Sequence, residues 1–255
     1  MGRKKADGLK GRRIKKAAIL LFWLCLWQGI SLWVDRPIFL VGPCETLAAI
    51  FRLAGTGPFW HAVFSSLARI GFGFTLAFSI GLICGSAAYF RPFFGELLSP
   101  VVTLMKTIPV ASFVILALIW AGADNLSLII SFLVVFPIIY LNTVAGLKST
   151  DRQLLEMSQV YRMKSLARAL HIYRPALAPY LVSACQVALG MSWKSGIAAE
   201  VIGTPQYSIG ENLYMAKVFF TTDELFAWTA VIIALSFLFE KAVLILIKEA
   251  AREKI

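Results

Sequence analysis

Long apolar runs alternate with short polar segments along almost the whole chain. A bilayer core of about 30 Å needs roughly 20 apolar helical residues to cross it. Six segments meet this length, and they cover residues 17–34, 61–89, 97–121, 126–146, 176–201 and 225–247. The pattern predicts an all-α integral membrane protein with about six transmembrane helices. Pro100 and Pro109 in the third segment and Pro179 in the fifth predict bends there.

One polar segment, residues 149–173, stands out between two of these runs. It reads STDRQLLEMSQVYRMKSLARALHIY and is followed by Pro175. A capping-box match, Thr150-Asp-Arg-Gln153, predicts a helix start. The helix then places five residues on one side, which are Leu154, Leu155, Met157, Ser158 and Tyr161, and a second helical turn is expected over 165–171. Such a helix either docks a partner or lies on the inner leaflet.

Three other short elements are predicted in the remaining polar loops. Pro43 is well placed at the first turn of a short amphipathic helix in the loop 35–60. Ser208-Ile-Gly-Glu211 matches a capping box and predicts a helix over 209–218. Thr221-Thr-Asp-Glu224 matches the same pattern just before the last apolar run.

Composition agrees with a membrane protein: 59% of residues are hydrophobic, 15% are charged and the mean hydropathy is +0.76. Soluble domains carry about a quarter charged residues. Three of the four cysteines lie in apolar runs, so they do not form a disulfide framework.

The net charge is +11, and the positions of the lysines and arginines indicate which loops lie on the cytosolic side. With the N-terminus inside, most of the 25 lysines and arginines fall in the cytosolic pieces 1–16, 90–96, 148–175 and 248–255. The outer pieces 35–60 and 202–224 hold only Arg36, Arg52 and Lys217. We expect both ends inside, with the basic tail anchored on membrane lipid. Because the tail has no interleaved aromatic residues, no nucleic-acid partner is expected.

These patterns predict three regions along the chain. Residues 1–16 form a basic cytosolic tail, and 17–60 contain the first transmembrane helix and an outer loop. Residues 61–250 form the membrane core, which carries the cytosolic loop 148–175.

From Leu104 onward the chain resembles the permease subunits of bacterial ABC importers, in particular those for sulfonates, taurine and nitrate. The resemblance is carried by several motifs along this stretch, which are Lys106-Thr-Ile-Pro-Val-Ala, Phe136-Pro-Ile-Ile-Tyr-Leu-Asn-Thr-Val-Ala-Gly, Ala188-Leu-Gly-Met-Ser-Trp and Ala199-Glu-Val-Ile-Gly. Permeases of this kind have an inner-loop signature of Glu-Ala-Ala, with glycine six, isoleucine sixteen and proline nineteen residues after the glutamate. Glu156, Ile172 and Pro175 stand at these spacings.

Three signature positions differ in this chain. Met157 and Ser158 replace the two alanines, and Arg162 stands at the glycine. Because glycine there permits positive φ cheaply, Arg162 must either adopt a strained conformation or turn differently.

The resemblance implies a type I ABC importer permease fold in the bacterial inner (plasma) membrane. It implies a second permease chain in a homodimer, two copies of an ATP-binding subunit and an extracytoplasmic solute-binding protein. ATP and Mg would be bound by the partner, because no G-x-x-x-x-G-K-[ST] occurs in this chain. The expected ATPase-docking residues are Leu154, Leu155, Glu156, Met157, Ser158, Gln159, Tyr161 and Arg162.

Charged residues within apolar segments are costly and often functional. Lys106, Lys194 and Glu200 lie in such segments, and together with Trp193 they are the expected lining of a solute path. Lysines there favour an anionic solute. The alternative is that Lys106 and Lys194 pair with carbonyls or carboxylates at helix contacts, and that Trp193 belongs to an interfacial belt.

Three other functions were weighed against the permease. An intramembrane enzyme or metal site is disfavoured because the only histidines, His61 and His171, fall near opposite faces. A secondary carrier is disfavoured because we expect no Asp or Glu at the membrane centre and see no repeat between halves. A membrane-coupling subunit of a vitamin-type importer would also dock ATPases, but the motifs from Phe136 onward fit the binding-protein-dependent class better.

Overall fold

The computed structural model describes the backbone of residues 2–34, 36 and 38–252, and the side chains of 15, 18–34, 36, 38–245 and 247. The basic tail therefore has, apart from Lys15, no described side chains. Helices account for nearly all of the described backbone, and no strand occurs in it. The all-α prediction is confirmed.

The chain divides into two compact units, each of which is described by itself. One contains 1–59 and 212–231, and the other contains 60–211 and 232–255. The helices are α1 (Gly2–Val34), α2 (Pro43–Ala54), α3 (Gly57–Phe90), α4 (Pro92–Thr107), α5 (Val110–Ala121), α6 (Leu126–Lys148), α7 (Arg152–Val160), α8 (Ser165–Arg168), the π-helical turn η1 (Ala169–Tyr173), α9 (Arg174–Gly203), α10 (Ile209–Val218) and α11 (Thr222–Arg252).

Four of the described helical segments are long and apolar enough to cross a membrane, namely Gly57–Phe90, Leu126–Lys148, Ser165–Gly203 and Thr222–Ile245. A bent pair, α4 and α5, makes a fifth if it is one span, and Ala18–Val34 is a shorter apolar helix. The expectation of six spans with both ends inside stays a prediction.

The third predicted span is not one helix, because α4 and α5 meet at 105°. Ile108, which precedes Pro109, has extended backbone angles of φ −72° and ψ 131°. A residue before proline is pushed out of the helical region by the proline ring, so α4 ends there. The bend predicted at Pro109 is therefore a full break, whereas α4 and α9 continue through Pro100 and Pro179.

The smaller unit is held by pairs between its two chain segments. Phe59 stacks on Trp228 with ring centroids 4.9 Å apart. The Arg52 guanidinium donates to the Asp223 carboxylate at 2.7 Å, and this hydrogen bond raises the pKa of Arg52. The predicted helix at Pro43 is confirmed as α2, with proline in its first turn.

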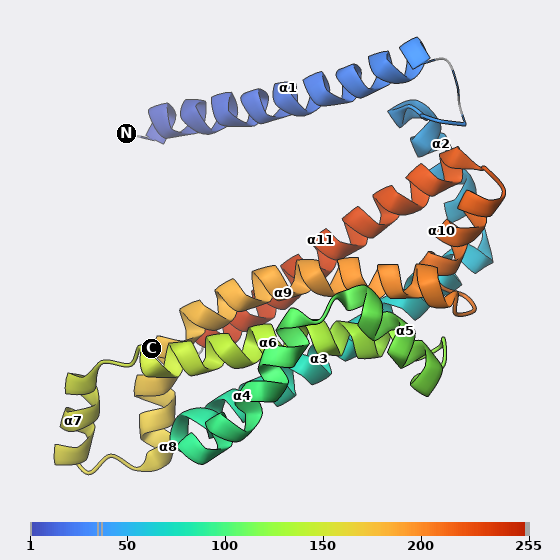
Figure 1. Cartoon of the computed structure of the whole chain (residues 1–255). Coiled ribbons are helices and arrows are strands. Elements are labelled where there is room, and N and C mark those ends of the chain that lie inside the picture. Colours follow the sequence, from blue (N-terminus) through green and yellow to red (C-terminus); the bar gives the residue numbers. More distant parts are fainter. Residues whose placement is uncertain (1, 35, 37, 253–255) are drawn as a thin grey trace. The chain divides into compact units, whose positions relative to one another are not determined.

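The core of the larger unit lies where α3, α6 and α9 meet, and Figure 1 shows α6 and α9 side by side. Its buried side chains come mainly from α6 and α9, and include Val135, Phe136, Ile139, Ala184, Cys185, Ala188 and Leu189. Small residues allow α3 to approach α6 closely: a Cβ on Gly85 would lie 2.7 Å from Thr143 Cβ.

A buried carboxylate ties three segments together at the distal end of α9, away from α7. Glu200 is fully buried, and its Oε2 accepts from Ser66 Oγ at 2.7 Å and from Gly210 N at 3.2 Å. Ser66 Oγ in turn accepts from Ile209 N at 2.9 Å. Gly210 packs so closely that a Cβ there would lie 2.6 Å from Val201 N.

The same end carries two further ties. The capping match at Ser208 is confirmed, since Glu211 N donates to Ser208 Oγ at 2.9 Å and α10 covers the predicted residues. The Arg69 guanidinium lies 3.7 Å from Asp124 Oδ1 and donates to the Gln206 carbonyl at 3.4 Å.

Candidate functional site

The helix α7 begins at Asp151, one residue later than the capping match suggested. The Asp151 carboxylate accepts from Gln153 N at 2.8 Å and lies at the positive end of the helix dipole. Thr150, the expected cap, has a buried hydroxyl with no hydrogen-bond partner in the described part of the chain. Thr150 was therefore wrong as the cap.

The helix ends at a residue in the left-handed conformation. Arg162 has φ +49°, Met163 N donates to Ser158 O at 2.9 Å, and Arg162 N donates to Gln159 O at 3.0 Å. This pair of bonds is a Schellman motif, which glycine usually closes. Of the two possibilities left open for Arg162, the structure has the strained one.

Replacing Arg162 by glycine is expected to stabilise the end of α7 by about 1 kcal/mol, because glycine reaches positive φ without a Cβ clash. Hydrogen exchange of the amides of 157–163 should slow by about fivefold, as that free energy implies. The control is Lys164→Gly, where φ is −61°, so glycine gains nothing there. Unchanged or faster exchange in Arg162→Gly would contradict the strain.

The side chains expected on one side of α7 differ in exposure. Leu154, Met157 and Tyr161 are 44%, 45% and 75% exposed, and at spacings of three and four residues they form one stripe. Ser158 is buried, and its hydroxyl donates to Leu155 O at 2.7 Å. Leu155 and Ser158 are therefore less exposed than the other three residues of the predicted side, and the docking role of all five stays a prediction.

A polar edge accompanies this apolar stripe. Glu156 accepts from Arg152 Nε at 3.0 Å across one helical turn, and Gln159 is exposed. Such an exposed pair contributes little to stability. Apart from Leu155 and Ser158, the docking residues expected from the sequence are thus at the surface.

Short loops join both ends of α7 to membrane-length helical segments, as Figure 1 shows. Three residues separate it from α6, and after a short turn α8 continues through η1 into α9. Pro175 lacks an N–H for the preceding turn, and the wider π turn before it accommodates this. Ile172 is buried within that turn. A displacement of α7 would therefore act on α6 and α9 without a flexible linker.

The four residues expected to line a solute path do not share one environment. Trp193 and Glu200 are buried inside the chain, with 1% and 0% exposure, although Trp193 lines the same cavity as Lys194. Lys106 and Lys194 are exposed. Lys106 lines a cavity of about 480 Å³ with the polar residues Glu96, Ser99, Thr103 and Lys148 among others.

Lys194 lines a second cavity, of about 360 Å³, together with Glu240. Glu240 lies within the apolar segment Thr222–Ile245, close to its end rather than at its centre. The neighbouring Lys241 Nζ lies 4.5 Å from the Phe237 ring centroid.

The candidate site contains no group of protein metal ligands. Within the described residues, no three His, Cys, Asp or Glu side chains are placed to hold a metal ion. The four cysteines are free and range from exposed Cys25 and Cys44 to buried Cys185.

Comparison with known proteins gives a consistent result. The family described as binding-protein-dependent transport system inner membrane component matches residues 77–250. The taurine transport system permease protein of Escherichia coli (strain K12) is 26% identical over 88% of this chain and 82% of its own length. A putative aliphatic sulfonates transport permease protein of Bacillus subtilis (strain 168) is 27% identical over 89% and 80%. A nitrate import permease protein of Synechococcus elongatus is 26% identical over 72% and 69%.

Proposed function

The chain belongs to the family of binding-protein-dependent transport system inner membrane components, which are ABC importer permeases, and on that premise we propose that it forms the solute path of an ATP-driven importer and docks a separate ATPase. Its apolar helices make it a multi-pass protein of the plasma membrane.

The observation that carries the docking proposal is the geometry of α7. This short helix is capped at both ends, carries the exposed stripe Leu154, Met157 and Tyr161, and is joined closely to α6 and α9. An exposed apolar stripe on a rigid helix suits insertion into a groove of a partner. ATP-driven closure of two ATPase subunits would then rotate the membrane helices as rigid bodies.

The full importer we propose contains two copies of this chain, two ATPase subunits that bind ATP and Mg, and a solute-binding protein outside the membrane. Hydrolysis belongs to the partner, because this chain contains no phosphate-binding loop. The relatives named for taurine, aliphatic sulfonates and nitrate support a small anion as solute.

Two exposed lysines of the larger unit support the same solute class. Lys106 and Lys194 each line a cavity within or beside an apolar helix, where a fixed positive charge favours an anion. Trp193 lines the Lys194 cavity with only 1% of its side chain exposed, and the fully buried Glu200 does not enter this proposal.

Reconstitution tests the proposed function directly. The chain, co-expressed with its ATPase and binding protein, should co-purify with the ATPase and import solute into proteoliposomes only when ATP is supplied. Tyr161→Ala should weaken both results. Transport by the chain alone, driven by an ion gradient, would refute the proposal in favour of a secondary carrier, and ATP-driven uptake without any soluble binding protein would favour a vitamin-type importer.

Replacing either lysine by glutamine tests the solute path. Lys106→Gln and Lys194→Gln should each raise the apparent KM for an anionic solute by about 10-fold, since one charge-assisted hydrogen bond contributes about 1.5 kcal/mol. ATPase assembly should be unchanged. The exposed Lys217→Gln is the control, because its side chain lines neither cavity. An unchanged KM in both path variants would exclude these lysines from solute contact.

A further inference from the structure

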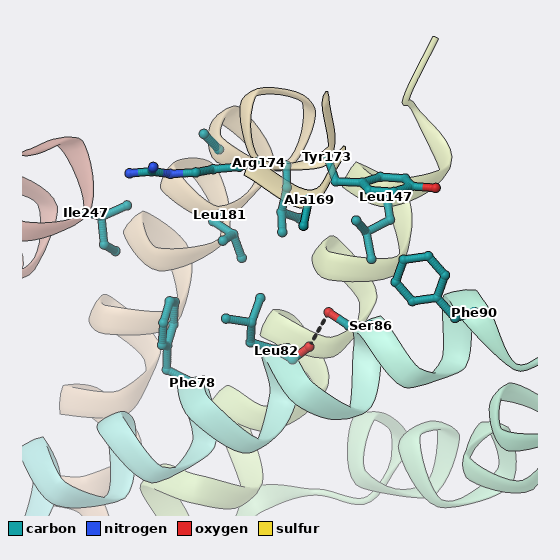
Figure 2. A pocket seen from close by; sticks show the side chains of 12 residues that line it. Phe78, Leu82, Ser86, Phe90, Leu147, Ala169, Tyr173, Arg174, Leu181 and Ile247 are labelled. Carbon is teal, nitrogen blue, oxygen red and sulfur yellow. Dashed lines mark hydrogen bonds between the residues drawn. The ribbon is translucent and has the colours of Figure 1, made fainter. Parts of the chain in front are cut away.

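A cavity of the larger unit is not used by the proposed transport path. It has a volume of about 590 Å³ and lies within the larger unit, between side chains of α3, α6, η1, α9 and α11 (Figure 2). Phe78, Leu82, Leu177, Leu181 and Ile247 give it an apolar lining. Water would find few hydrogen-bond partners there, so an apolar occupant fits it better.

Three of the side chains that line the cavity carry polar groups, namely Ser86, Tyr173 and Arg174. The Ser86 hydroxyl donates to Leu82 O at 2.8 Å within its own helix and is therefore occupied. Arg174 also lines the cavity, and Figure 2 shows its side chain extended toward Ile247. No hydrogen bond or ion pair joins the Arg174 guanidinium to another described residue. An occupant with an apolar chain and an anionic group would satisfy both features.

The cavity lies where the membrane-length helices end. Phe90 is the last residue of α3 and Leu147 is the last but one of α6, and Arg174 lies in the first third of the continuous helical segment Ser165–Gly203, beside these ends. Arg174 is therefore at the depth of lipid headgroups, while the apolar lining extends into the hydrocarbon region. This is also the end that carries the basic segment 148–174.

We propose that this cavity binds an anionic phospholipid, with an acyl chain between α3, α9 and α11 and the phosphate paired with Arg174. A planar guanidinium binds phosphate oxygens through two parallel hydrogen bonds. Basic pockets between transmembrane helices on the cytoplasmic side are established sites for anionic headgroups. The proposal needs the membrane location of the chain and does not depend on its solute or ATPase.

Charge argues against a protein helix as the occupant. The apolar helix segment Ala18–Val34 has no acidic side chain, and the residues before it are strongly basic. Neither would neutralise Arg174, whether they came from this chain or from a second copy. A phospholipid supplies the apolar chain and the anion in one molecule.

Lipid-dependent thermal stability of the purified full-length chain tests the proposal. Phosphatidylglycerol and phosphatidylethanolamine with identical acyl chains are added to the protein in mild detergent, and unfolding is followed by tryptophan fluorescence. Phosphatidylglycerol should raise the Tm by about 3 °C more than phosphatidylethanolamine, as binding at several times Kd implies. Native mass spectrometry should show retained phosphatidylglycerol.

Two variants test separately the binding of the lipid headgroup and the binding of the acyl chain. Arg174→Gln should remove the preference for phosphatidylglycerol and leave the shared effect of both lipids. Ala178→Trp, which fills the cavity, should remove the retained lipid, and the smaller Ala178→Leu serves if the tryptophan variant does not fold. Arg91→Gln, an exposed arginine outside the cavity, should behave like the wild type.

Several results would overturn the proposal. Equal stabilisation by the two lipids, or an undiminished preference in Arg174→Gln, would exclude a headgroup at Arg174. An equal shift with inorganic phosphate alone would mean that a free anion, not a lipid, binds there. A changed oligomer size in Ala178→Trp without loss of lipid would identify a protein helix as the occupant.

Discussion

Replacing Met157 by aspartate is expected to abolish assembly with the ATPase while leaving the chain inserted and folded in the membrane. Met157 lies in the middle of the exposed stripe formed with Leu154 and Tyr161, so a docked groove would enclose it. An unpaired carboxylate enclosed there costs about 2–4 kcal/mol, which weakens binding by roughly 30- to 1000-fold. Since 45% of Met157 is exposed, the fold itself should be little affected.

The measurement is the amount of ATPase retained on the purified permease, together with ATP-dependent uptake in proteoliposomes. Met157→Leu is the matched control, because a volume-conserving apolar exchange should cost less than about 1.5 kcal/mol. Met157→Lys separates docking from the alternative of a helix lying on lipid. An apolar groove on the ATPase should bind the lysine variant as weakly as the aspartate variant. An anionic lipid leaflet, by contrast, should bind a more basic helix equally well or better.

Full ATPase retention and uptake in Met157→Asp would remove α7 as the docking element. Loss in Met157→Asp with wild-type behaviour in Met157→Lys would instead favour a helix on the leaflet. Docking to an ATPase and binding to the lipid leaflet therefore predict opposite results for the variant Met157→Lys.

Local chemistry predicted most of the short elements. The serine and glutamate at Ser208 and Glu211 specify a helix start through their neighbouring amides, and α10 covers the predicted range. At α7 the capping match put the cap at Thr150, whereas the carboxylate of the next residue, Asp151, is the group that accepts. The conformation at the end of α7 could not be predicted from the sequence. Arg162 adopts positive φ only because the Schellman motif forms, in which Met163 N donates to Ser158 O.

Features of the apolar helices that depend on tertiary contacts could not be predicted from the sequence. The break at Pro109 could be expected in position but not in angle, since 105° depends on how α4 and α5 pack on α6. The burial of charged residues could not be predicted from the sequence either. Glu200 and Lys194 are both charged residues in one apolar segment, yet Glu200 is hydrogen-bonded to Ser66 and Gly210 whereas Lys194 is exposed. Periodicity along one helix carries no information about a partner 134 residues away.

Replacing Glu200 by alanine is expected to lower the free energy of unfolding by about 3–5 kcal/mol, the largest effect on stability that we predict. The carboxylate oxygen Oε2 accepts from both Ser66 Oγ and Gly210 N, and its loss leaves two buried donors without an acceptor and a cavity in their place. The Tm in detergent should fall by about 10 °C. Proteolysis near 204–211 should increase, because this loop loses its tie to α3 and α9.

Glu200→Gln separates structure from transport at the same residue. The amide oxygen can still accept from Ser66 and Gly210, so stability should fall by no more than about 1–2 kcal/mol. If Glu200 acts only by holding the distal end of α9, this variant keeps both its fold and most of its uptake. If its charge served the solute path, uptake would fall while the Tm stayed near the wild type. The second outcome would mean that Glu200 lines the solute path after all. Because Glu200 is buried here, the solute could reach it only in a conformation in which the hydrogen bond to Ser66 is broken.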